Sequence, residues 1–121
     1  MTTTDLTKER VARNQATFRE ANEKIEATAD KMQLPPERPV PFICECAERA
    51  CMELVRLTVE EYEDVRQHAR RFFVVPGHAA PATAIGAAVV VAELPGYTLV
   101  DKIGVAGEVA EQLYDEQCDE L

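Results

Sequence analysis

Three cysteines stand close together in the stretch FICECAERAC, at Cys44, Cys46 and Cys51. Thiols at such short spacing form disulfides, bind a metal or carry out redox chemistry, and each of these uses constrains the surrounding backbone. Side chains at i and i+2 of an extended segment point to the same side, so Cys44 and Cys46 face the same way. Cys51 returns after a short gap, and the three thiolates can then converge on one ion, as tetrahedral zinc requires.

A fourth ligand is needed to close such a site. His78 follows the bend formed by Pro76 and Gly77, where a loop can bring an imidazole to the thiolates. Three cysteines and one histidine are an established ligand set for structural Zn²⁺. The rivals are His68, in the charged stretch RQHARR, and Cys118, in the acidic stretch YDEQCDEL, which we expect to be a mobile tail. We therefore predict a zinc site formed by Cys44, Cys46, Cys51 and His78.

The N-terminal stretch MTTTDLTKERVARNQ is polar throughout, and no apolar run approaches the ~20 residues that span a bilayer. We expect a soluble, cytoplasmic protein without membrane association. Clustered cysteines in a reducing compartment are more often metal-binding or catalytic than a disulfide framework. A redox-active thiol pair, an iron–sulfur cluster and plain buried cysteines remain the alternatives.

The charge balance limits the possible partners. The chain has 13 Lys and Arg residues against 22 Asp and Glu residues, a formal net charge of -9. Affinity for a phosphate backbone comes largely from Lys and Arg, so this balance argues against nucleic-acid binding. Arg66, Arg70 and Arg71 lie close together, but basic residues at a helix end usually interact with the helix dipole. We expect a protein partner.

The first segment, from about Thr4 to Met32, is predicted to be one long helix. One narrow apolar stripe has a member every seven residues, and polar side chains interrupt it. Its members are Val11, Phe18, Ile25 and Met32. We expect this helix to dock on its own domain, with a homodimer through the same stripe as the alternative. Residues 1–32 thus form an N-terminal helix, followed by a proline-rich connector at 33–40.

The rest of the chain predicts an α+β fold. Short strands are expected at Phe42–Cys46, Glu53–Leu57 and Phe72–Val75, and a helix begins after Thr58, which with Glu61 has the pattern of a capping box. The stretch LPG predicts a β-hairpin that joins Ala87–Glu93 to Tyr97–Ile103, although its alanine-rich start also suits a helix. A closing helix is expected at Val105–Tyr114. Residues 41–114 would form the zinc-binding domain and 115–121 an acidic tail.

Four stretches of the chain, FICECAERAC, LTVEEYEDVR, FFVVPGH and YTLVDKIG, resemble a group of short, uncharacterised actinobacterial proteins. That group shares a Cys-x-Cys-x4-Cys cluster, a Leu-Thr-x2-Glu-Tyr-x2-Val-Arg helix start and a Pro-Gly-His turn. The resemblance covers nearly the whole chain and implies that the three clustered cysteines and His78 form one site. It implies no activity. The chain departs from the pattern at Ala79, where an acidic residue is expected.

The motifs of known zinc and hydrolytic enzymes are missing from the sequence, including His-x-Glu, Gly-x-Ser-x-Gly and His-Glu-x2-His. The carboxylates nearest the cysteines in sequence, Glu45 and Glu48, are interpreted as exposed turn residues. The main hypothesis is a zinc-binding interaction or regulatory module that binds its partner through a helix. The alternatives are a thiol sensor that releases zinc on oxidation and a small zinc enzyme with an open coordination position.

Overall fold

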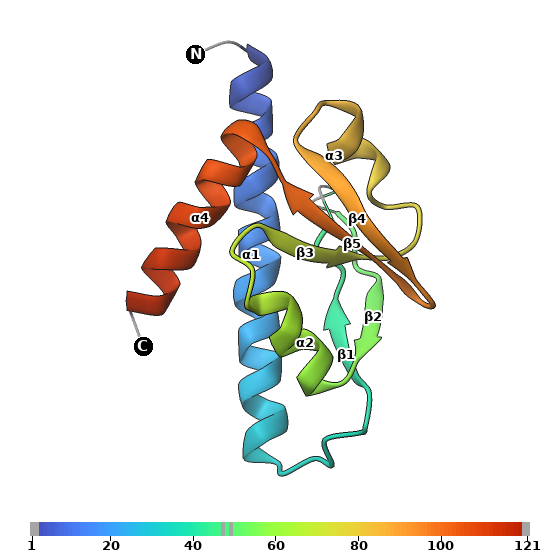
Figure 1. Ribbon diagram of the computed structural model, residues 1–121. Helices are drawn as coiled ribbons and strands as arrows, with labels where there is room; N and C mark the ends of the chain where they lie inside the picture. Colours follow the sequence, from blue (N-terminus) through green and yellow to red (C-terminus); the bar gives the residue numbers. More distant parts are fainter. Residues whose placement is uncertain (1–2, 47, 49, 120–121) are drawn as a thin grey trace.

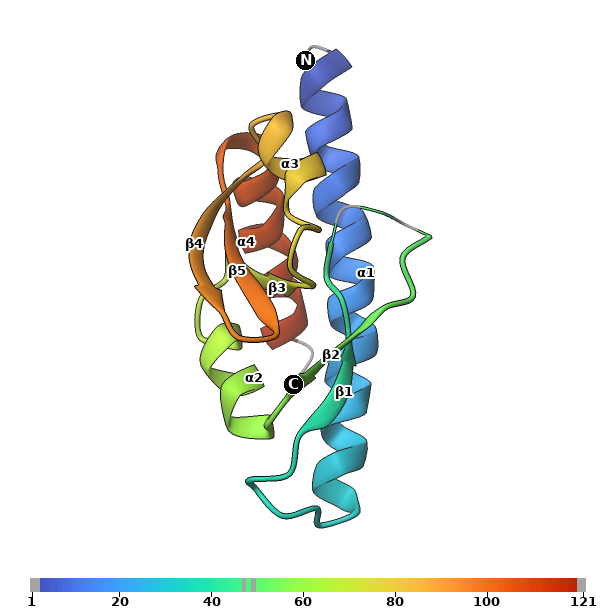
Figure 2. The same cartoon turned by 90° about the vertical axis from the view of Figure 1, so that its right-hand side faces the viewer.

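Helix α1 (Thr3–Lys31) runs the length of the molecule (Figure 1, Figure 2). The computed structural model describes residues 3–46, 48 and 50–119. Along the chain follow β1 (Val40–Ile43), β2 (Leu54–Leu57), α2 (Val59–Arg66), β3 (Arg71–Val74), α3 (Ala80–Ala84), β4 (Ala88–Leu94), β5 (Tyr97–Lys102) and α4 (Gly104–Asp119). This is the predicted α+β fold. In the described part of the chain, no helix is long and apolar enough to cross a membrane.

The strands form two small antiparallel sheets. In the first, β1 pairs with β2, with Val40 opposite Leu57 and Ile43 opposite Leu54. In the second, β5 lies between β3 and β4, and a β-bulge interrupts the β4–β5 register between Val90 and Ala92. The β4–β5 pair is the predicted hairpin. It turns at Gly96, whose φ of 91° favours glycine.

Local sequence signals explain where the helices begin and end. The Thr58 side chain accepts a hydrogen bond from the Glu61 backbone N–H, and the Glu61 carboxylate accepts one from the Thr58 N–H, which confirms the capping box of α2. The alanine-rich stretch before β4 includes the short helix α3. Helix α4 extends five residues beyond the predicted end at Tyr114, to Asp119, so most of the expected tail is helical.

An aromatic cluster forms the centre of the apolar core. The rings of Phe42 and Tyr62 are stacked with centroids 4.4 Å apart, and Phe73 meets both edge-on. All three side chains are fully buried. These rings come from β1, α2 and β3, so aromatic packing joins the two sheets and holds β1 and β3 close together.

The buried face of α1 differs from the predicted apolar stripe. The helix packs against α4 and β1 of the same chain, as expected. However, Met32 is 64% exposed, and the buried positions include Gln15, Arg19 and Asn22. Val11 lies outside the described side chains. Ile25 of the predicted stripe does pack against the core, so apolar contacts and polar side chains with partners inside the fold together dock this helix. A homodimer through α1 stays a prediction.

Candidate metal centre

The four residues predicted to bind zinc come together from two separate loops. Cys44 and Cys46 follow β1, Cys51 precedes β2, and His78 follows β3. One ligand atom from each of the four residues lies within 4.8 Å of the others. Cys44 and Cys46 are buried and Cys51 is partly exposed. The structure thus forms a Cys3His cluster that can hold a metal ion such as zinc.

The spacing of the ligand atoms suits a tetrahedral ion. Nδ1 of His78 lies 3.6 Å from Sγ of Cys44 and 3.6 Å from Sγ of Cys51. Around tetrahedral zinc, with Zn–S near 2.3 Å and Zn–N near 2.0 Å, neighbouring ligand atoms are about 3.5–3.8 Å apart. These two distances therefore fall in the range expected for zinc ligands.

A tight turn carries His78 to the cysteines. The His78 backbone N–H donates to the Val75 carbonyl at 2.9 Å, which closes the turn around Pro76 and Gly77. Gly77 has a φ of 91°, the conformation that the third residue of a type II turn needs, and proline suits the second. The Val75 N–H also donates to Sγ of Cys44 at 3.2 Å, so the same loop supports a thiolate.

Burial shapes the acidity of the thiols. Desolvation raises the pKa of Cys44 above its usual range, although the hydrogen bond from the Val75 N–H acts in the opposite direction. Desolvation likewise raises the pKa of Cys46. Without a cation these thiols stay protonated at neutral pH. A dication bound here would compensate the thiolate charges, and its binding would release protons.

A carboxylate that the sequence analysis missed orients the imidazole. An oxygen of Glu53 lies 2.7 Å from Nε2 of His78, on the opposite ring nitrogen from the one that faces the thiols. Metal-binding histidines usually donate their second N–H to such an acceptor, which fixes the tautomer. The only signal in the sequence for this role of Glu53 was its position at the start of the second predicted strand.

Of the two carboxylates nearest the cysteines in sequence, one lies differently from expectation. Glu45 was predicted to be an exposed turn residue, and this is wrong, because its side chain is fully buried and paired with Arg19. Glu48 is exposed, as predicted. His68 is exposed and is not part of the cluster. Cys118 lies outside the described side chains.

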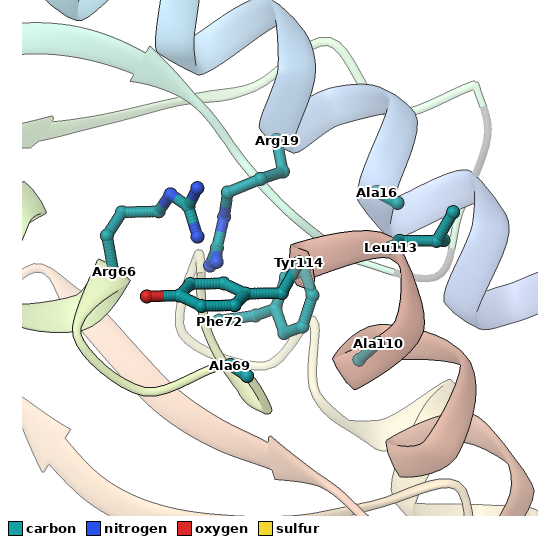
Figure 3. A pocket seen from close by; sticks show the side chains of 8 residues that line it. All are labelled: Ala16, Arg19, Arg66, Ala69, Phe72, Ala110, Leu113 and Tyr114. Carbon is teal, nitrogen blue, oxygen red and sulfur yellow. The ribbon is translucent and has the colours of Figure 1, made fainter. Parts of the chain in front are cut away.

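A second feature lies between α1, α4 and the start of β3 (Figure 3). There the Arg19 guanidinium stacks on the Phe72 ring at 4.1 Å, and Arg66 lies over the Tyr114 ring at 5.0 Å. The cavity that they line measures about 10 Å³, room for one water at most. It is therefore packed interior rather than a substrate site.

Comparisons with known protein families, with curated proteins and with solved structures find no match to this chain. The resemblance to the actinobacterial group stays a prediction.

Proposed function

We propose that this chain binds one zinc ion through Cys44, Cys46, Cys51 and His78, and that the metal is structural. The observation that carries the proposal is the convergence of three thiols and one imidazole from two loops, with ligand atoms within 4.8 Å of one another. The Glu53 carboxylate behind His78 adds the outer hydrogen bond that metal-binding histidines usually have. With four protein ligands, the ion has no position left for a reacting water.

A zinc-stabilised chain of this size fits an interaction or regulatory module, which would bind a protein partner through a helix. A mostly apolar hollow of about 400 Å³ at the C-terminal end of α1 supports this. It is lined by α1, the connector and β1, and Met32 at its edge is 64% exposed. Exposed apolar surface of this kind suits contact with another protein.

The second candidate is a thiol sensor, favoured by the partial exposure of Cys51. Hydrogen peroxide would oxidise two of the thiols to a disulfide and be reduced to water. The metal would then lose two of its ligands and dissociate. Zinc content measured before and after peroxide, and again after a thiol reductant, separates a sensor from a permanently closed site.

The test is elemental analysis followed by X-ray absorption at the zinc edge, on protein purified under reducing conditions. We expect one zinc per chain, coordinated by three sulfurs and one imidazole nitrogen. Cys44→Ser, Cys46→Ser and Cys51→Ser should each lose the metal, and Cys118→Ser should keep it. Folded, reduced protein that neither contains nor binds zinc would refute the proposal. Three sulfurs with an exchangeable oxygen would favour the enzyme alternative.

A further inference from the structure

The residue between two of the proposed zinc ligands is a buried anchor of helix α1. Cys44, Glu45 and Cys46 are consecutive, and neighbouring side chains of an extended segment point to opposite faces. Cys44 and Cys46 accordingly take part in the metal cluster, whereas Glu45 reaches the other way. Its carboxylate accepts two hydrogen bonds from the Arg19 guanidinium, at 2.7 and 2.8 Å.

Asn22, one turn further along α1, strengthens the same contact. Its amide nitrogen donates to Glu45 at 3.1 Å and to the Ile43 carbonyl at 2.9 Å, and its amide oxygen accepts from the Ile43 N–H at 2.7 Å. Asn22 thus occupies the edge of β1 that β2 leaves open. Helix α1 is bonded to the backbone and the side chains that lead directly into the cysteines.

The strand that leads to His78 is hydrogen-bonded to the same two residues, Arg19 and Glu45. Arg19 donates to the Arg71 carbonyl at 2.6 Å, and the Glu45 N–H donates to the Phe73 carbonyl at 3.0 Å. Both carbonyls belong to β3, the strand that ends just before the turn carrying His78. One buried polar network therefore connects α1, the cysteine loop and the strand that precedes the fourth ligand.

Burial makes this network sensitive to geometry. The Arg19 and Glu45 side chains are 3% and 0% exposed, and a buried ion pair is stable only while its partners keep their alignment. Desolvation acts to lower the pKa of Arg19, but the charge and hydrogen bonds of Glu45, together with Tyr62 and Glu23, outweigh it, and the pKa is raised. If Cys44 and Cys46 lose a common ion, the loop that holds Glu45 is freed to move, and Arg19 would lose its partner.

We propose that zinc binding and the docking of α1 are energetically coupled through Glu45 and Arg19, so that loss of the metal loosens the helix. This rests on the proposed function. Coupling between two sites is reciprocal, so weakening the helix contact must also weaken zinc binding. Arg19 and Glu45 are thus positioning residues for the metal centre, and the position of α1 reports whether zinc is bound.

The first test compares zinc affinities, measured by competition with a chromophoric chelator under reducing conditions. Arg19→Gln should lower zinc affinity at least tenfold, within the usual range of coupling. The matched control is Arg70→Gln, which removes the ion pair that Arg70, in the turn before β3, makes with Glu111 of α4. Arg70→Gln should keep wild-type zinc affinity.

Equal affinities in all three proteins would overturn the coupling but would not contradict the zinc site. No zinc binding by the wild type would refute the site itself.

The second test uses only the wild-type chain, in case Arg19→Gln does not fold. Hydrogen exchange is measured on the zinc-loaded protein and after chelation with the thiols kept reduced. We expect the amides of α1 around residues 15–29 to lose at least tenfold more protection than those of β5, which lies in the other sheet. Equal loss in α1 and β5, or unchanged protection in α1, would contradict the proposal.

Discussion

Glu53 lies 2.7 Å from Nε2 of His78, while Nδ1 of the same imidazole faces the sulfurs of Cys44 and Cys51 at 3.6 Å. This arrangement assigns the two ring nitrogens different roles. With the proton on Nε2, the imidazole would donate a hydrogen bond to the carboxylate, and the lone pair of Nδ1 would be free for a metal.

Glu53→Ala is therefore expected to weaken zinc binding. Outer-shell partners of metal-binding histidines typically contribute 10–100-fold to affinity, and because the Glu53 side chain is 60% exposed we expect a loss of about tenfold. Glu53→Gln, which keeps an acceptor oxygen, should recover part of it. Chelator competition gives the affinities. Glu37→Ala, in the exposed connector before β1, is the control, and an unchanged affinity in Glu53→Ala would show that the carboxylate does not support the ligand.

The sequence predicted those parts of the molecule that depend on local chemistry. The capping box at Thr58 and Glu61, the LPG hairpin and the Pro-Gly turn before His78 each depend on the conformational preferences of a few neighbouring residues. The Cys3His cluster followed from ligand type and spacing. The capping box and the turns need no knowledge of how distant segments pack, whereas the cluster also needs β1, β2 and β3 to bring its two loops together.

The missed features that matter for the site depend on tertiary contacts of polar residues. Arg19, Asn22 and Glu45 resemble solvent-exposed residues in the sequence, because periodicity counts only apolar side chains. Glu53 and His78 lie on separate loops, so their pairing appears only after β1, β2 and β3 have packed. Long-range hydrogen bonds thus contribute both to the docking of α1 and to the surroundings of the candidate metal centre.

Tyr62 offers a test of the aromatic core. Among the described side chains, its hydroxyl is buried without a hydrogen-bond partner, and desolvation raises its pKa above the usual range. An unpaired buried polar group costs about 1–3 kcal/mol, so Tyr62→Phe should raise the free energy of unfolding by about 1 kcal/mol. Urea denaturation of the zinc-loaded protein measures this.

Tyr97→Phe is the matched control for Tyr62→Phe. The Tyr97 hydroxyl donates to the Glu61 carboxylate at 3.1 Å, so its loss should lower stability by about 1 kcal/mol. The same substitution is thus expected to have opposite signs at the two positions. A clear loss of stability in Tyr62→Phe would mean that this hydroxyl does have a partner in solution.

Glu26 on α1 lies among other carboxylates near α2. Burial raises its pKa to about 7, and the nearby charges of Glu63 and Glu23 act in the same direction. One of its oxygens is buried without a hydrogen-bond partner in the described part of the chain. The carboxyl group therefore binds a proton in the folded protein at a pH where the unfolded chain has released it.

The sign of the effect on stability follows from this difference in proton binding. Between the unfolded pKa of 4.5 and the folded pKa of about 7, the folded state binds more protons, so the contribution of Glu26 to stability falls as pH rises through this range. Glu26→Gln removes this loss, so the variant should be more stable than wild type at pH 8. We expect a difference of about 1 kcal/mol or less, because the carboxyl group is partly exposed and screened by solvent. The stabilities of the two proteins should converge near pH 5.

Urea denaturation at several pH values gives the difference in their free energies of unfolding, in which titrations common to both proteins cancel. Glu20→Gln, on the exposed face of α1, is the control. A difference that stays constant from pH 5 to 8 would refute the assignment of this titration to Glu26.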